Sequence, residues 1–134
     1  MRRAFFDSNV LLYGYAFADP RSLRAQAILE EGGAISVQCL NEFASVARRK
    51  LGMGFDRIGE ALSIVTGLCH PILPLDTDLH RLGLMIADEK RLSVYDGMIV
   101  AAAFMADCDI LYSEDMQHGL VIDGRLRIVN PFHA

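Results

Sequence analysis

Short, continuously apolar segments alternate along this chain with longer segments that have a helical pattern. Strands that are apolar throughout are buried on both faces, which is typical of a parallel sheet covered by helices. We therefore predict an α/β fold with a small, mainly parallel sheet flanked by helices on both faces. We expect strands at 5–6, 34–37, 71–75 and 109–113, helices at 9–17, 20–32, 40–51, 56–69, 77–92 and 93–108, and two extended pieces within 119–132.

The length and composition predict one globular domain over residues 1–134. The chain has 52% apolar and 22% charged residues, which is ordinary for a folded domain and unlike a disordered chain. Its longest uncharged apolar run, 97–106, is too short to cross a bilayer, and the first residues do not read as a signal peptide. Three widely spaced cysteines indicate a reducing compartment. We expect a cytoplasmic protein with no membrane partner.

Four acidic residues follow predicted strands or begin predicted helices. Asp7 ends the first strand, Glu42 lies in the first turn after the second strand, and Asp96 lies in the first turn of helix 93–108. Asp115 follows the strand 109–113. Because parallel strands bring their carboxyl ends to one edge of the sheet, at least three of these acids are expected to converge there.

Taken singly, most of these acids have an ordinary structural interpretation. Asp7 is a good N-cap for the helix that follows it. Asp96 stands three residues after Ser93, a spacing close to a capping box, and an acid there also suits the helix dipole. Glu114 and Asp115 fit a turn. A protein whose acids are all caps and turn residues is therefore one alternative.

Glu42 is the acid that capping does not explain. At about 100° per residue, the helix around it carries an apolar stripe through Leu40, Phe43, Ala44, Ala47 and Leu51. Glu42 lies nearly opposite that stripe, on one side with Ser45 and Arg49. This polar side is either a solvated face or one wall of a cleft.

Several carboxylates crowded at one sheet edge would repel one another strongly unless a cation lay among them. No His or Cys accompanies them at ligand spacing, so the donors are all oxygen atoms. Mg²⁺ and Mn²⁺ prefer such donors, and these ions orient phosphates, neutralise their charge and activate water. The net charge of −4 disfavours a simple basic nucleic-acid coat, but it is compatible with a nuclease whose acids bind metal.

The segments "FFDSNVLLY", "NEFASVARRK", "YDGMIVAAA" and "LYSEDMQHG", in that order over essentially the whole chain, resemble the PIN-domain ribonucleases. Within that family they resemble the small VapC-type toxins of type II toxin–antitoxin pairs. The resemblance implies a single PIN domain and a Mg²⁺- or Mn²⁺-dependent endoribonuclease. It also implies an RNA substrate, a homodimer and a cognate VapB-type antitoxin. Helices 20–32 and 56–69 are candidate surfaces for the dimer and the antitoxin.

By matching motif, the resemblance also assigns roles to residues of this chain. The metal-binding and catalytic acids would be Asp7, Glu42, Asp96 and Asp115, with Ser8, Asn9, Ser113 and Glu114 as supporting residues. The choice between Glu114 and Asp115 as the last ligand stays open, with the motif favouring Asp115. Arg49 is a candidate contact for substrate phosphate, or else a cation that suits the helix C-terminus.

Two other functions remain in competition. One is a different Mg²⁺-dependent phosphoesterase, such as a haloacid-dehalogenase-like phosphatase. That family requires a second Asp two residues after the first, where this chain has Asn9. The other is a PIN-like module that binds RNA or protein without cleaving it, which only an assay distinguishes.

Overall fold

The computed structural model describes residues 3–133, and within that range the strands form two small sheets. The larger sheet has the order β1-β4-β6-β5, in which β1, β4 and β6 run parallel and β5 is antiparallel at the edge. The smaller sheet pairs β2 with β3 in parallel, and a bridge between Phe5 and Ala34 joins the two sheets. The strands are β1 (Ala4–Phe6), β2 (Ile35–Ser36), β3 (Ile72–Leu73), β4 (Ile110–Tyr112), β5 (Val121–Ile122) and β6 (Leu126–Val129).

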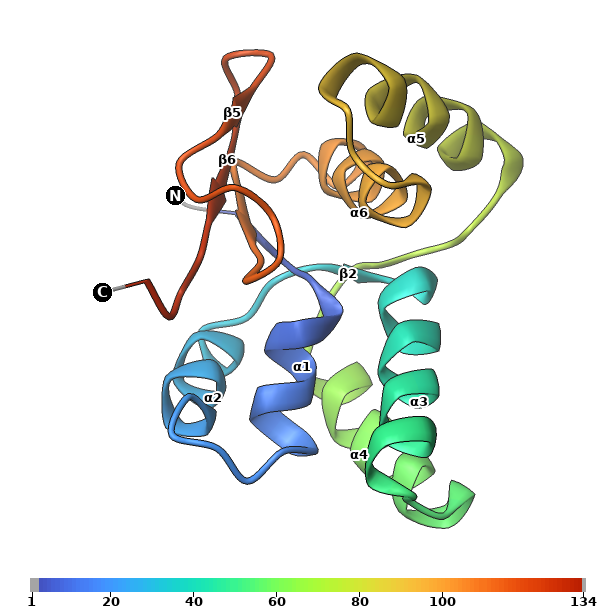
Figure 1. Ribbon diagram of the computed structural model, residues 1–134, viewed down its shortest axis with the longest axis vertical. Coiled ribbons are helices and arrows are strands. Elements are labelled where there is room, and N and C mark those ends of the chain that lie inside the picture. The colour runs from blue at the N-terminus through green and yellow to red at the C-terminus, as the bar shows by residue number, and fades with distance from the viewer. Residues whose placement is uncertain (1–2, 134) are drawn as a thin grey trace.

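The helices form two groups around these strands. In Figure 1, α1 to α4 gather in the lower half of the molecule, whereas α5 and α6 lie side by side in the upper half, to the right of β5 and β6. The chain follows the predicted alternation of strands and helices throughout. The helices are α1 (Ser8–Tyr15), α2 (Ser22–Glu30), α3 (Val37–Leu51), α4 (Phe55–Leu68), α5 (Thr77–Lys90) and α6 (Val94–Met105).

The predicted α/β fold with a mainly parallel sheet is confirmed, with three corrections of detail. The strands form two small sheets where we predicted one. Strands β2 and β3 have only two residues each, and one bridge, between Ala34 beside β2 and Phe5 of β1, connects the two sheets. Pro20 lies in a turn before α2 rather than in its first turn, since Ser22 begins that helix. Leu51, assigned to the buried stripe, is 43% exposed because the helix ends there at Gly52, whose φ is +62°.

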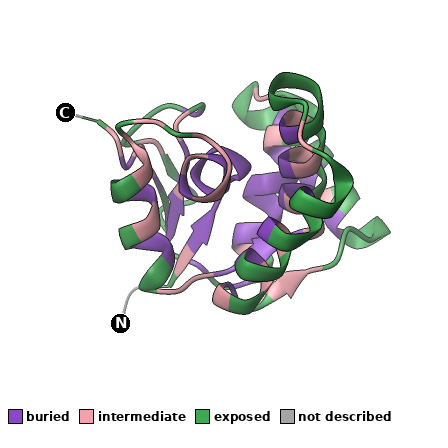
Figure 2. Cartoon of the chain, turned by 90° about the horizontal axis from the view of Figure 1, so that it is seen from below, coloured by how far each residue is buried: buried purple, intermediate pink, exposed green. Residues whose placement is uncertain are grey.

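Helix α6 is the buried helix that its composition predicts. Figure 2 shows buried residues along the central strands and the helix face beside them, and residues 97–103 of α6 are all buried. A Cβ atom added at Gly97 would lie against the carbonyl oxygen of Gly83 in α5. The two helices therefore cross at a distance that only glycine permits at this point, which fixes where the first turn of α6 lies. No helix within residues 3–133 is both long and apolar enough to span a bilayer.

Strands β1 and β4 end side by side, and this edge carries the polar residues considered below. The backbone N–H of Asp7 donates to the carbonyl oxygen of Tyr112, at 3.0 Å. The N–H of Ser113 donates in turn to Val129 of β6, at 3.0 Å. The parallel pairing therefore delivers Asp7 and Ser113 to the same edge, as the topology predicts.

Candidate active site

Asp7 is a buried carboxylate at the end of β1, with only 2% of its surface exposed. It is also the N-cap of α1, because its Oδ1 accepts from the backbone N–H of Ser8 at 2.7 Å. Its Oδ2 accepts from the Ser113 hydroxyl at 2.8 Å. Asp7 therefore caps α1, as the sequence predicts. An exposed Asp would cap the helix equally well, so capping does not explain why Asp7 is buried.

Ser8 and Asn9 connect Asp7 to acids from distant parts of the chain. The Ser8 hydroxyl donates to Glu42 Oε1 at 2.8 Å. The Asn9 amide group donates to Asp115 Oδ2 at 3.2 Å and lies 3.4 Å from Asp7 Oδ2. Two consecutive residues at the start of α1 thus bring three of the predicted acids into one hydrogen-bonded group.

Glu42 projects from α3 toward this group. The predicted position in the first turn is wrong, because α3 begins at Val37 and Glu42 is one turn further along. The predicted polar side is correct: Gln38, one turn earlier, donates to Glu42 Oε2 at 2.8 Å. Since Glu42 Oε1 accepts from Ser8, both oxygen atoms of this carboxylate have fixed partners.

Asp96 approaches the same group from α6. Its backbone N–H donates to the Ser93 hydroxyl at 3.1 Å, so Ser93 is the N-cap that the spacing predicts. Partial burial raises the pKa of the Asp96 carboxyl, and the nearby charges of Asp115 and Glu42 raise it further. The mutual repulsion shows that the acids lie close enough to sense one another's charge.

The burial of Asp7 has a large electrostatic consequence. Removal from water raises the pKa of its carboxyl from 3.8 to about 7, and the charges of Glu42 and Asp96 add to this effect. The hydrogen bonds from Ser113 and Ser8 act in the opposite direction, but they are too weak to offset burial. The ionised form of Asp7 is therefore unfavourable in the protein alone and would be relieved by a cation.

Glu114 and Asp115 are neighbours with different surroundings. The Glu114 carboxylate accepts from the Tyr13 hydroxyl at 2.8 Å and from Arg21 at 2.8 Å, so it is turned away from the other acids. Its backbone N–H donates to Asn9 Oδ1 at 3.1 Å. Asp115 is bound by the Asn9 amide group instead and is exposed. This arrangement favours Asp115 over Glu114 as a candidate ligand.

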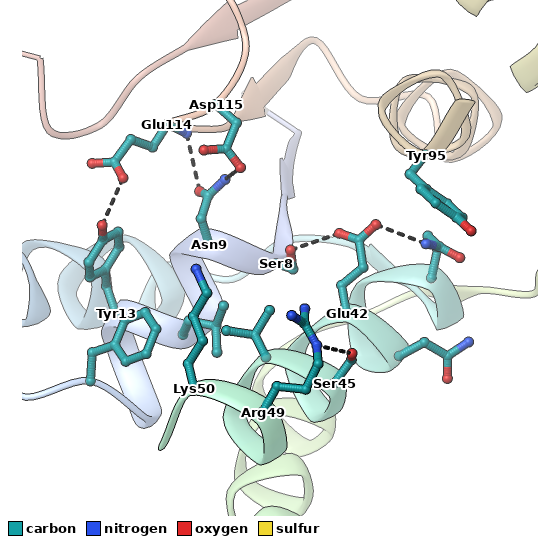
Figure 3. Close-up of a pocket in the computed structure, with 15 residues that line it drawn as sticks. Ser8, Asn9, Tyr13, Glu42, Ser45, Arg49, Lys50, Tyr95, Glu114 and Asp115 are labelled. Atoms are coloured by element: carbon teal, nitrogen blue, oxygen red, sulfur yellow. Dashed lines mark hydrogen bonds between the residues drawn. The ribbon is translucent and has the colours of Figure 1, made fainter. Parts of the chain in front are cut away.

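A cavity of about 800 Å³ opens in front of these residues. Figure 3 shows Glu42 and Asp115 at its edge, with Arg49 and Lys50 of α3 projecting into the same space. Arg49 donates to Ser45 at 3.2 Å, on the side of α3 predicted for both residues. The cavity therefore combines a carboxylate group with two cations from the neighbouring helix face.

The donors of this site suit a hard divalent cation, although the side chains are not arranged around one. Within residues 3–133, no three His, Cys, Asp or Glu side chains are positioned to hold a single ion directly. The carboxylates are held by Ser8, Asn9, Gln38 and Ser113 instead. All the available donors are oxygen atoms, and a buried acid repelled by two others is a group that Mg²⁺ or Mn²⁺ would stabilise. The chemistry of these donors therefore fits such an ion.

Several residues of the site were not predicted from the sequence. Gln38 supports Glu42, Tyr13 and Arg21 hold Glu114, and Tyr95 lines the cavity. Helix periodicity could have found two of them: Gln38 precedes Glu42 by four residues, and Tyr13 follows Asn9 by four. No sequence signal indicates Arg21, which reaches Glu114 across 93 residues of chain.

Comparisons with known proteins identify the family and the fold. The model of the PIN domain family matches residues 4–119. A search of curated proteins gives no match. A toxin–antitoxin complex from Klebsiella pneumoniae superposes with a TM-score of 0.72 at 20% identity, covering 98% of this chain and 99% of that one.

Two further solved structures have the same fold. The Mycobacterium tuberculosis VapC20 structure, described as a sarcin–ricin loop cleaving toxin, superposes with a TM-score of 0.67 at 18% identity, covering 84% of this chain and 89% of the toxin. VapBC2 from Rickettsia felis, bound to a promoter DNA fragment, superposes with a TM-score of 0.65 at 16% identity and covers 93% and 96%.

Proposed function

Since this chain belongs to the PIN domain family, we propose that it is a divalent-cation-dependent endoribonuclease, the toxin of a type II toxin–antitoxin pair. The observation that carries the proposal is the carboxylate group around Asp7. Asp7, Glu42 and Asp115 come from three separate segments and share the polar side chains of Ser8 and Asn9. A fold that buries a carboxylate against other carboxylates is costly unless the group serves a charged ligand.

Asp7, Glu42, Asp96 and Asp115 are the residues proposed to hold the cation, which we take to be Mg²⁺ or Mn²⁺. When bound, such an ion supplies positive charge to a phosphodiester and makes water more acidic. Ser8, Asn9 and Ser113 orient the carboxylates through the hydrogen bonds described above. Such supporting hydrogen bonds commonly keep metal-binding acids in a productive orientation.

Side chains around the cavity are proposed to handle the proton of the attacking water and to bind neighbouring phosphates. Asp115 is exposed and one of its oxygen atoms accepts from Asn9, so its carboxylate is suited to accept the proton of a water molecule whose oxygen atom bonds to phosphorus. The bond from phosphorus to the leaving ribose oxygen breaks in exchange, and that oxygen takes up a proton from solvent. Arg49 and Lys50 offer positive charge to neighbouring phosphates of the strand. Arg21 and Tyr13 hold Glu114, and through it they fix the backbone that presents Asp115.

The proposed substrate and partner follow from the structural neighbours. One is described as a toxin that cleaves the sarcin–ricin loop and others as toxin–antitoxin complexes, so RNA and a VapB-type antitoxin are the proposed ligands here. A homodimer and action in the cytoplasm belong to the same proposal, as does the assignment of residues 1–134 to a single PIN domain.

The direct test is cleavage of a short single-stranded RNA in Mg²⁺ or Mn²⁺. Asp7→Asn and Asp96→Asn are each expected to lower the rate at least about 100-fold, because losing a cation ligand removes several kcal/mol of transition-state stabilisation. Asp78→Asn, in the first turn of α5 and exposed, is the matched control and is expected to keep wild-type activity. Cleavage that survives both site substitutions, or that persists in EDTA, would contradict the proposal.

A further inference from the structure

A second cleft of about 490 Å³ lies beside the carboxylate cavity. The two share Gln38 and Tyr95 as a common wall. The apolar lining residues of the second cleft are Leu75, Val94 and Met98, and its polar lining residues at the start of α5 are Asp76, Thr77 and His80. Among the residues that line it, none is a Lys or Arg, whereas the carboxylate cavity contains Arg49 and Lys50. The second cleft therefore suits an uncharged, flat and partly polar group better than a phosphate.

Tyr95 is the most exposed of the Phe and Tyr side chains at these cavities, with 64% of its surface accessible. Within the described residues, its ring has neither an aromatic neighbour nor a cation against it. Tyr13 differs in this respect, because Arg21 lies 4.3 Å from its ring centre and Phe17 and Phe132 pack edge-on against it. The ring of Tyr95 is thus free to receive a stacking ligand, and Figure 3 shows it projecting above Glu42.

The backbone beneath Tyr95 is held firmly. Ser93 caps α6, and Gly97 packs against Gly83 of α5 at a distance that excludes a Cβ atom. Residues 98–103 of α6, which follow, are all buried. A large apolar ring on a fixed backbone loses little conformational freedom when a ligand stacks on it, which makes it an effective platform.

We propose that this second cleft binds one unpaired nucleobase of the RNA, with Tyr95 as its stacking platform, an inference that rests on the proposed nuclease function. Tyr95 and Arg49 lie on opposite sides of Glu42 (Figure 3). A strand can therefore place one phosphate at the carboxylates, the next toward Arg49 and Lys50, and the adjoining base against Tyr95. The base must be unstacked from its neighbours, so the substrate is single-stranded at this position.

The test uses short single-stranded RNAs in which 2-aminopurine replaces one base at a time, mixed with the full chain in EDTA at low salt. Stacking on Tyr95 is expected to quench the fluorescence at one position near the cleavage site. Tyr95→Ala is expected to remove that quenching and weaken binding about 5- to 150-fold, which is the range for the loss of one base–aromatic stack. Tyr95→Phe keeps the ring and is expected to retain both.

Phe55→Ala is the matched control, since Phe55 is 73% exposed but lines neither cavity. Uniform quenching, or none, in the wild-type protein would overturn the inference. Unchanged RNA binding by Tyr95→Ala would also overturn it and would assign the cleft to another ligand, such as a protein segment. Cleavage of the same RNAs in Mn²⁺ tests the nuclease separately. Cleavage without position-specific quenching refutes only the subsite, and quenching without cleavage refutes only the nuclease.

Discussion

Replacing Asp7 with Asn should stabilise the protein in the absence of metal, and the gain should depend on pH. The Asp7 carboxyl has a pKa of about 7 in the folded chain and 3.8 as its ordinary value. Folding therefore favours the protonated form, and the stability that this contributes at acid pH is lost as the pH rises from about 4 to about 7. Asn is a neutral isostere that can still accept from the Ser8 N–H.

The magnitude follows from the same two values. At pH 8, where Asp7 is ionised in the fold, its carboxyl lowers stability by about 4 kcal/mol relative to a neutral side chain. At pH 5, where it is protonated in the fold, it lowers stability by less than about 2 kcal/mol. The difference of about 2–3 kcal/mol is the useful quantity, because altered hydrogen bonds at Asn contribute equally at both pH values. At about 3–5 °C per kcal/mol, the gain in Tm for Asp7→Asn should be roughly 10 °C larger at pH 8 than at pH 5.

The assay is urea or thermal unfolding of wild type and Asp7→Asn in EDTA across this pH range. Asp78→Asn is the control and should show only a small difference that does not change with pH, because Asp78 is exposed. A gain for Asp7→Asn that is absent, or that is the same at pH 5 and pH 8, would refute the conclusion that burial makes ionised Asp7 unfavourable. A destabilised Asp7→Asn at both pH values would refute the same conclusion, because Asn caps a helix about as well as Asp does and the loss could not come from the cap.

Three further predictions concern the site and the fold. Asp115→Asn should lower Mn²⁺-dependent cleavage at least about 100-fold and Glu114→Gln less than tenfold, because Glu114 is held away from the other acids; equal losses would contradict this assignment. Arg49→Ala should raise KM for RNA several-fold and leave kcat nearly unchanged. It should also reduce the slope of log K for RNA binding against log salt concentration by about one, the value for one lost phosphate contact, and an unchanged slope would exclude that contact. Gly97→Ala should destabilise the protein by about 2–4 kcal/mol, because the added Cβ atom meets the backbone of α5. Gly59→Ala, at an exposed position of α4, should stabilise the protein by about 0.5–1 kcal/mol. Urea unfolding of both glycine variants checks the last pair, and equal effects would argue against the close crossing of α5 and α6.

Much of the fold could be predicted because its strands are continuous apolar runs and its helices have a clear periodicity. The apolar runs that end at Asp7 and Ser113 are parallel strands, and parallel pairing alone brings those residues together. Helix periodicity placed Glu42 and Arg49 on the same polar side of α3. These features depend on local pattern and on topology, both of which the sequence carries directly.

Other features depend on contacts between distant residues and could not be predicted. The division into two sheets depends on β2 and β3, which are only two residues long. The capture of Glu114 depends on Arg21 and Tyr13, whose side chains come from elements far away in the chain. Tyr95 is 64% exposed although the helix that carries it is apolar nearly all round, so the sequence does not indicate which of its large side chains stays in solvent.

A crystal of the full chain grown with Mn²⁺, with its anomalous scattering measured, would test the carboxylate site most directly. We expect a manganese peak coordinated by Asp7 together with carboxylates from at least two of the other three segments, those of Glu42, Asp96 and Asp115. An absent peak at saturating Mn²⁺, or one bound elsewhere while Asp7 keeps its bonds to Ser8 and Ser113, would contradict the assignment of these acids to a common cation.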